Sequence, residues 1–128
     1  MQLDRLNDLS FRIIECAIEI HRALGPGLLE STYRKCMIYE LAQRSFGVLS
    51  EKLVPVRYKD LVLDAGYRLD LIVEDTIVVE LKAVETVLPV HRQQVLTYLR
   101  HTDKPLGLLI NFNVEVLVKG VTRIKNGY

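Results

Sequence analysis

Apolar residues recur at helical spacing near the start of the chain. Between Asp8 and Leu24 they return every three or four positions, which predicts an amphipathic helix with Asp8 or Ser10 as its N-terminal cap. The tripeptide Gly25-Pro26-Gly27 interrupts this pattern, because glycine is flexible and proline has no N–H to donate. We therefore expect the first helix to end at this tripeptide.

A second helical pattern follows the tripeptide. It begins at Leu28 or Leu29 and continues to Arg44 or Ser45. Gly47 lies just beyond its end, at a position where helices are often closed by a left-handed glycine. The sequence therefore predicts two consecutive helices in the first third of the chain.

The pattern becomes extended from Val48 to Leu63. Lys59-Asp60 interrupts it and predicts a turn between two strands. Pro55 lies within the first of these segments, and its missing N–H indicates an edge strand or an irregularity in the pairing. We expect this part of the chain to lie at one side of a sheet.

A β-hairpin is predicted at the centre of the chain. Two apolar runs, Leu69–Val73 and Ile77–Leu81, flank the polar residues 74–76. The second run is apolar on both faces, which is typical of a central strand. A three-residue turn would pair Asp70 with Glu80, whereas a two-residue turn would shift the pairing by one and separate the two acids. We predict the three-residue turn.

The last part of the chain predicts a helix followed by extended segments. Pro89 is suited to the first turn of a helix that ends at Arg100 or His101. Leu106–Phe112 is an apolar run too short for a typical helix, and a last extended segment is expected within Val116–Ile124. The order is helix, helix, three or four strands, helix and strand, which predicts a single α/β domain spanning all 128 residues.

Composition adds limits on the class of protein. The chain is 49% hydrophobic and 26% charged, and no apolar stretch is long enough to span a membrane. Cys16 and Cys36 lie in helical patterns, so we expect reduced thiols in a cytoplasmic protein. The net charge is only +1, so binding of nucleic acid would require a local basic patch.

Charged residues occur where the predicted central sheet should be apolar. Glu80 and Lys82 share one strand face, and the three-residue turn would add Asp70. Buried charges are costly unless they are paired or bind a metal. One interpretation is a Glu80–Lys82 ion pair beside a solvated Asp70, and the other is a divalent cation that neutralises both acids. Oxygen ligands without a cluster of His or Cys favour magnesium or manganese over zinc.

The helices contribute further candidates. Glu30 falls in the first turn of the second helix, where an acid is favourable whatever the function, and Tyr33 lies on nearly the same face. Gln94 and Tyr98 are four residues apart in the helix that follows the central strand, so one helix face could look back over the site. His21 precedes the Gly-Pro-Gly turn, which it could stabilise, or it could contact a substrate.

Taken in order, these motifs resemble a known group of enzymes. An Asp, an E-x-K on the next strand and a helix with Q-x-x-x-Y are similar to the PD-(D/E)XK nuclease superfamily, and within it to the RecB-like branch. The stretch Gly27–Tyr33, GLLESTY, resembles the motif that names the GxxExxY protein family, and the resemblance extends from about Ile13 to Ile124. It implies a restriction-endonuclease-like core, with a central mixed β-sheet flanked by helices in the order α-α-β-β-β-α-β.

The resemblance also implies roles for individual residues. The residues that match Asp70 and Glu80, with the main-chain carbonyl of Leu81, hold Mg²⁺ or Mn²⁺ in the superfamily. The residue that matches Lys82 orients or activates the attacking water. The acid that matches Glu30 completes the metal shell, directly or through water.

Four other residues are expected to bind nucleic acid or to support the site. In the RecB-like branch, the positions of Gln94 and Tyr98 support the lysine and touch nucleic acid, and Tyr33 and His21 are further candidates. The expected function is a metal-dependent nuclease that acts on nucleic acid, on DNA in preference to RNA. The alternative is a nuclease-fold module that binds nucleic acid, another protein or a second copy of itself, with little or no catalysis.

Overall fold

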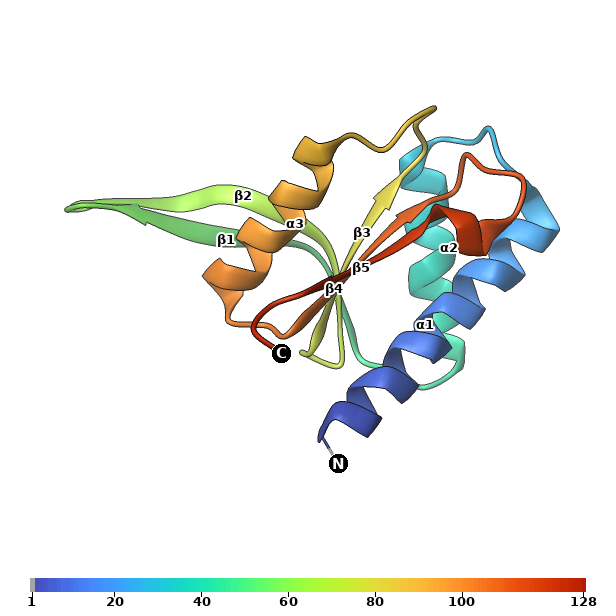
Figure 1. The fold of residues 1–128 in the computed structure, drawn as a ribbon, viewed down its shortest axis with the longest axis horizontal. Helices are drawn as coiled ribbons and strands as arrows, with labels where there is room; N and C mark the ends of the chain where they lie inside the picture. The colour runs from blue at the N-terminus through green and yellow to red at the C-terminus, as the bar shows by residue number, and fades with distance from the viewer. Residues whose placement is uncertain (1) are drawn as a thin grey trace.

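A five-stranded mixed sheet forms the centre of the protein, with its strands in chain order (Figure 1). The computed structural model describes residues 2–128, with the side chain of Gln2 left out. The strands are β1 (Val48–Tyr58), β2 (Leu61–Val73), β3 (Ile77–Lys82), β4 (Leu106–Asn111) and β5 (Val121–Lys125). β3 and β4 are parallel and the other neighbouring pairs are antiparallel.

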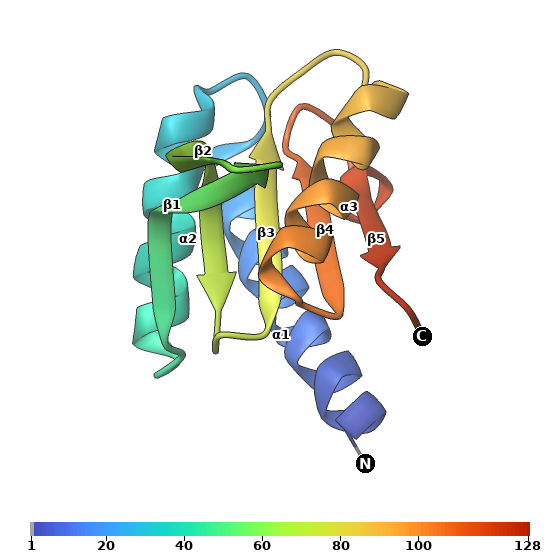
Figure 2. The ribbon, with the colours of Figure 1, turned by 90° about the vertical axis from the view of Figure 1, so that its left-hand side faces the viewer.

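Helices cover both faces of this sheet (Figure 2). α1 (Gln2–Leu24) and α2 (Glu30–Gln43) pack on one face, and α3 (Pro89–Thr102), which connects β3 to β4, packs on the other. This arrangement confirms the predicted mixed sheet flanked by helices. β5 confirms the last extended segment expected within Val116–Ile124, although it ends one residue later, and a short 3₁₀ turn (Leu117–Gly120) precedes it.

The central strand β3 divides its side chains between the two faces. On the side of α1 and α2 the core takes Ile77, Val79 and Leu81. Val78 belongs to the core beneath α3. Because side chains alternate along a strand, Glu80 and Lys82 lie on the α3 side with Val78.

The first helix starts earlier than the sequence pattern indicated. α1 is already helical at Gln2, so Asp8 and Ser10 lie inside it and the predicted cap is wrong. Leu6, three residues before Leu9, is buried in the core and extends the apolar stripe by about one turn. Ser10 has a different role, because its hydroxyl accepts a hydrogen bond from Nη1 of Arg123 at 2.6 Å and joins α1 to β5.

The end of the second helix also differs from the prediction. Ser45, with φ 65°, is the left-handed residue, and Gly47 does not close the helix. The N–H of Phe46 donates to the carbonyl of Leu41 at 3.0 Å, which completes a Schellman motif. Gly47 instead donates its N–H to the Glu74 carboxylate at 2.6 Å. A serine accepts the left-handed strain here because Phe46 can then pack against the core.

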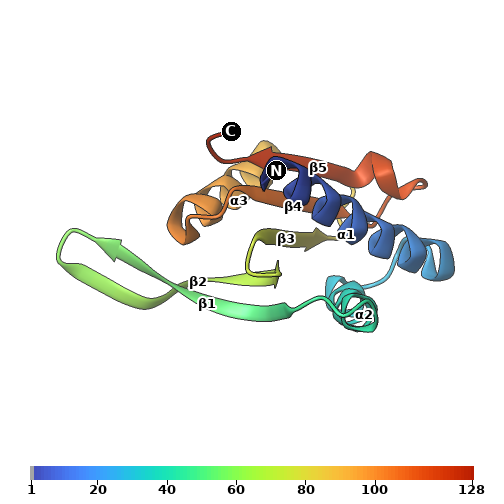
Figure 3. The same ribbon diagram turned by 90° about the horizontal axis from the view of Figure 1, so that it is seen from below.

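β1 and β2 form a long hairpin whose far end projects from the rest of the protein (Figures 1 and 3). We call residues 55–66 the distal arm. Its turn lies at Lys59-Asp60 as predicted, with φ 52° at Lys59. Pro55 lies on the edge strand β1, and the pairing register shifts there, so both the edge position and the irregularity predicted from this proline are confirmed. A Cβ at Gly66 would overlap the Val56 side chain, so the close approach of the strands requires glycine there.

Two further observations concern the helices. Both cysteines are free as predicted, Cys16 in the core and Cys36 at its margin, and burial raises the pKa of Cys16 to about 11. Within residues 2–128, no helix combines the length and the apolar character needed to cross a membrane.

Candidate functional site

The site lies where β2 and β3 stop pairing. Val73 pairs with Ile77 and Leu71 pairs with Val79, so the next position brings Asp70 opposite Glu80. This is the register of the predicted three-residue turn, in which Glu74 and Asp75 both take φ 51°. The predicted register is therefore confirmed. The ladder ends at Leu71 and Val79, and the two acids stand at the opening between the strands.

Beyond this point, the main-chain N–H groups on one edge of β3 donate hydrogen bonds to side chains instead of to β2. The main-chain N–H of Leu81 donates to Oδ2 of Asp70 at 2.9 Å. Two residues later, the N–H of Ala83 donates to Oε2 of Glu30 at 3.4 Å. Because the N–H and C=O of one strand residue point to the same edge, the carbonyl of Leu81 faces this edge between the two carboxylates.

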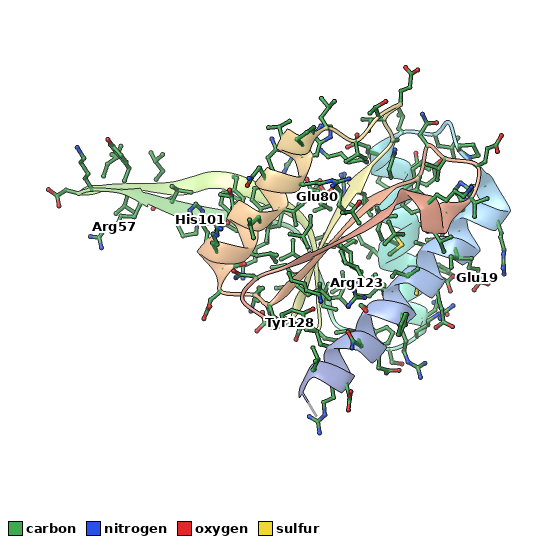
Figure 4. The ribbon with its side chains drawn as sticks, viewed as in Figure 1. Glu19, Arg57, Glu80, His101, Arg123 and Tyr128 are labelled. Atoms are coloured by element: carbon green, nitrogen blue, oxygen red, sulfur yellow. The ribbon has the colours of Figure 1, made fainter. Side chains whose placement is uncertain are left out.

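Glu80 is a buried acid without full hydrogen bonding. Its side chain lies beneath α3 (Figure 4), the residue is 8% exposed, and its buried Oε1 has no hydrogen-bond partner within the described residues. Burial, and next the negative charge of Asp70, raise the pKa of Glu80 from 4.5 to about 8, while Lys82 acts in the opposite direction. The carboxyl groups of Glu80 and Asp70 therefore compete for one counter-charge.

Lys82 only partly supplies this charge. Its Nζ lies 3.9 Å from Oε2 of Glu80, which is longer than a good hydrogen bond. Its side chain is 18% exposed, so the ammonium reaches the surface of the site. Glu80 and Lys82 thus form only a loose ion pair. It leaves Oε1 of Glu80 without a hydrogen-bond partner among the described residues.

The acids of the site do not form a ready-made cage. Within residues 2–128 no three His, Cys, Asp or Glu side chains are grouped so as to hold a metal ion. Asp70 and Glu80 are next to each other, whereas Glu30 accepts its hydrogen bond from the N–H of Ala83, farther along the same edge of β3. A metal here would need main-chain oxygen and water in addition to the two carboxylates.

Comparison with known proteins gives one clear result. The family model described as the PD-(D/E)XK nuclease superfamily matches residues 7–124, which is most of the chain and includes every residue of the site. The chain belongs to this superfamily. No curated protein and no solved structure matches it significantly. Nucleases of the superfamily generally use Mg²⁺ or Mn²⁺ and bind nucleic acid.

In this superfamily member, Tyr98 of α3 lies within electrostatic range of the two carboxylates. Burial, and next the charges of Glu80 and Asp70, raise the pKa of its hydroxyl. Gln94 is exposed one helical turn earlier. Spacing of four residues places it on the same face of α3 as Tyr98.

Tyr33 and His21 lie in the interior, on the other side of the sheet. Tyr33 is fully buried and stacks on Phe112, with ring centroids 4.2 Å apart. Its hydroxyl donates to the Gly25 carbonyl at 2.6 Å and accepts from the Leu28 N–H at 3.2 Å. A buried ring cannot touch nucleic acid, so of the two expected roles only support is open to Tyr33: it fixes the turn before α2 and hence the position of Glu30.

His21 also has a structural partner. It is 8% exposed, and its Nε2 lies 2.8 Å from the carbonyl of Val114. The contact joins the end of α1 to the loop after β4. The observed contact therefore favours stabilisation of the loops over substrate contact.

Sequence reasoning missed Asn111, a buried side chain at the end of β4. It pairs in register with Lys82. Its Oδ1 accepts from the N–H groups of Val84 and Asn113, and its Nδ2 donates to the Val84 carbonyl at 2.9 Å. Asn111 thus holds the chain immediately after Lys82. The available signal was an asparagine at the end of the apolar run LGLLINF.

Tyr67 was also missed. It lies on β2, three residues before Asp70, and stacks on Tyr98 with ring centroids 4.4 Å apart and planes 10° apart. Burial, followed by Tyr98, raises the pKa of Tyr67 to about 12, so its hydroxyl stays protonated at neutral pH. The pair joins the strand that carries Asp70 to the helix that covers Glu80.

Proposed function

We propose that this member of the superfamily is a Mg²⁺- or Mn²⁺-dependent phosphodiesterase that cleaves nucleic acid at Asp70, Glu80 and Lys82. The observation that carries the proposal is the unpartnered Oε1 of Glu80, buried beside the Asp70 carboxylate. Two adjacent acids with an unsatisfied buried oxygen are unfavourable without a further positive charge. A divalent cation would supply that charge.

The donors of the site fit such an ion. Asp70 and Glu80 offer carboxylate oxygens, the Leu81 carbonyl lies on the same edge, and Glu30 lies farther along that edge, from where it would join through water. Hard oxygen donors suit Mg²⁺ or Mn²⁺ and not zinc. When bound, the ion would polarise a phosphoryl oxygen and lower the pKa of a coordinated water.

Lys82 has the geometry for a second task. Its ammonium is partly buried, close to Glu80 and still open to the surface of the site. It can donate hydrogen bonds to the attacking water and stabilise negative charge that develops on the phosphate. Its loose contact with Glu80 leaves protons free for that purpose.

Other residues would position the substrate. Tyr98 lies within electrostatic range of both carboxylates and Gln94 is exposed on the same helix face, which suits contact with nucleic acid, DNA in preference to RNA. The motif GLLESTY supports membership of the GxxExxY family, because it contains Glu30 and the buried Tyr33 that holds the turn before it. With the E-x-K strand and the Q-x-x-x-Y helix, the motif also supports the RecB-like branch and a single domain over the chain.

The experiment is cleavage of labelled DNA and RNA with Mg²⁺, Mn²⁺ or EDTA. Lys82→Ala should abolish metal-dependent cleavage. Lys104→Ala is a matched control, because both lysine side chains are 18% exposed and both lie beside an acid, Glu80 or Asp75. Equal loss in both variants, or cleavage that survives Lys82→Ala, would refute the assigned role of Lys82.

One observation favours the alternative of a binding module. The net charge is +1, and Arg34 on α2 is paired with Glu51 at 3.0 Å. Fewer free cations weaken phosphate binding. Wild-type protein that binds nucleic acid or a protein partner but cleaves neither DNA nor RNA with either metal would support the alternative.

A further inference from the structure

The distal arm is a projecting two-stranded ribbon with little support. Every residue from Arg57 to Gly66 is exposed. Figures 1 and 3 show the ribbon extending well past α3 and past the rest of the sheet. A two-stranded ribbon by itself is only marginally stable in water. An arm of this length therefore gains stability from anything that covers it.

One face of the arm carries four apolar side chains, and the Lys59 ammonium lies 5.3 Å from the centre of the Tyr58 ring at its tip. The register pairs Tyr58 with Leu61 and Val56 with Leu63, and opposed residues of a ladder share a face. We call these four residues the arm apolar face. Tyr58, Leu61 and Leu63 are 63%, 55% and 47% exposed. The opposite face carries the pair of Arg57 and Val62.

This face continues the surface that α3 covers nearer the body. Val54 pairs with Tyr67, and both pack in the core beneath α3. Val54, Val56 and Tyr58 alternate with outward residues along β1, so they lie on one face. The arm apolar face is therefore the uncovered extension of a core face.

We propose that the arm apolar face binds the same face of a second copy of this chain, with the two arms antiparallel about a two-fold axis. An apolar patch of this kind is self-complementary, which is what a two-fold contact requires. α3 occupies the base of the same face, so parallel arms would bring the two α3 helices into collision. Antiparallel arms avoid this, because each tip lies beyond the end of the opposing α3.

Charge supports this orientation. The antiparallel arrangement brings the tip of one arm, with Lys59 and Asp60, to the C-terminal end of α3 of the second copy. Arg100 and Asp103 are exposed at that end, so each end offers one cation and one anion to the other. Opposite charges across an interface of this kind favour one orientation over others.

Charge also argues against nucleic acid as the occupant. The charged residues of the arm are Arg57, Lys59, Asp60 and Asp64, which sum to zero. Phosphate binding requires unpaired cations, whereas a neutral apolar surface meets its own copy without net repulsion. Since only the arm is buried, we expect a weak dimer in equilibrium with the monomer.

The test is sedimentation velocity of the full chain over a wide concentration range, with EDTA and without nucleic acid. Wild type should pass from monomer to dimer as the concentration rises. Leu61→Glu should remain monomeric, and Val62→Glu should dimerise like wild type. The two residues are neighbours with nearly equal exposure, 55% and 53%, but lie on opposite faces of the arm. Equal thermal unfolding of dilute wild type and variants shows that the substitutions leave the fold intact.

Amide hydrogen exchange provides the second measurement. Amides of residues 57–66 should exchange more slowly at high concentration in wild type and Val62→Glu, and not in Leu61→Glu. A wild type that stays monomeric overturns the proposal, as does equal behaviour of the two variants or association without protection of the arm. The measurement contains no metal and no substrate, so its outcome is independent of nuclease activity.

Discussion

The Asp70 carboxylate accepts a hydrogen bond from the main-chain N–H of Leu81, at 2.9 Å, at the position where β2 and β3 separate. The bond fixes the acid at the edge of β3 and brings its charge next to Glu80. The two carboxylates repel each other in the folded protein and are far apart on average in the unfolded chain. Any ion that binds between them must therefore stabilise the fold.

We predict that Mg²⁺ or Mn²⁺ raises the melting temperature. Free metal at about a hundred times its dissociation constant contributes roughly 2.7 kcal/mol of stability, which shifts a domain of this size by several degrees. Asp70→Asn and Glu80→Gln should each abolish the shift, because each removes one ligand charge while keeping the shape. Thermal unfolding in EDTA and in millimolar metal measures this.

Asp64→Asn is the control for the metal experiment. Asp64 is an exposed acid of the distal arm, so its removal should leave the metal-induced shift unchanged. A wild type that shows no shift would contradict the prediction. If Asp70→Asn and Glu80→Gln shift as much as wild type, the ion is bound elsewhere.

The raised pKa of Glu80 predicts a pH dependence in the absence of metal. Because the folded pKa of about 8 exceeds the ordinary value of 4.5, the folded state holds the proton more tightly. The resulting stability is fully present below about pH 4.5 and is lost as the pH rises toward 8. Glu80→Gln should remove this decline and be more stable than wild type near pH 8. Urea unfolding in EDTA at about pH 5 and about pH 8 tests the direction.

Asp75→Asn serves as the control for the pH experiment. A hydrogen bond from Lys104 lowers the pKa of Asp75 below 3.8, so the contribution of Asp75 is lost only as the pH falls. The decline between pH 5 and pH 8 should persist in this variant. A flat profile in wild type, or a decline that remains in Glu80→Gln, would contradict the assignment to Glu80.

The register of the site could be read from the sequence because a short turn fixes it. Three polar residues between two apolar runs leave few ways to pair the runs, and a slip by one would expose the apolar faces. The edge position of β1 followed from Pro55 for a similarly local reason. The ends of the helices were predicted less accurately from the sequence. Ser45 adopts the left-handed conformation that the pattern assigned to Gly47, because packing of Phe46 outweighs the preference for glycine.

The parts of the site that the sequence did not indicate depend on contacts between distant residues. Asn111 holds Val84 across 27 positions, and this contact follows only from the parallel register of β3 and β4. The stacking of Tyr67 on Tyr98 depends on where α3 crosses β2. No local pattern encodes either geometry. Asn111 and Tyr67 both support the predicted site. The charged residues of the site could therefore be predicted from the sequence, whereas the residues that hold them in place could not.

The aromatic pair of Tyr67 and Tyr98 gives a prediction about stability. Tyr67→Phe keeps the stacked ring and should be close to wild type, because the hydroxyl makes only a 3.5 Å contact with the Tyr98 carbonyl. Tyr67→Leu should be less stable than Tyr67→Phe by about 0.5–1.5 kcal/mol, the typical contribution of an aromatic pair beyond area burial. Urea unfolding measures the difference. The same two substitutions at Tyr39, which is 64% exposed on α2, should differ little. Equal stability of the Phe and Leu variants at Tyr67 would show that the stacking is not stabilising.

Asn111 gives the last prediction. Asn111→Ala removes the partners of the Val84 N–H and C=O, next to Lys82, and should cost about 1–3 kcal/mol because buried main-chain groups lose their hydrogen bonds. Asn111→Asp keeps the acceptor and loses the donor to the Val84 carbonyl, so it should restore only part of the stability. Asn113→Ala, two residues away and exposed, should stay within about 0.5 kcal/mol of wild type. Urea unfolding of the three variants in EDTA separates these outcomes from any effect of metal. If Asn111→Ala were as stable as Asn113→Ala, the loop after Lys82 would be held by other contacts, and the supporting role of Asn111 would be refuted.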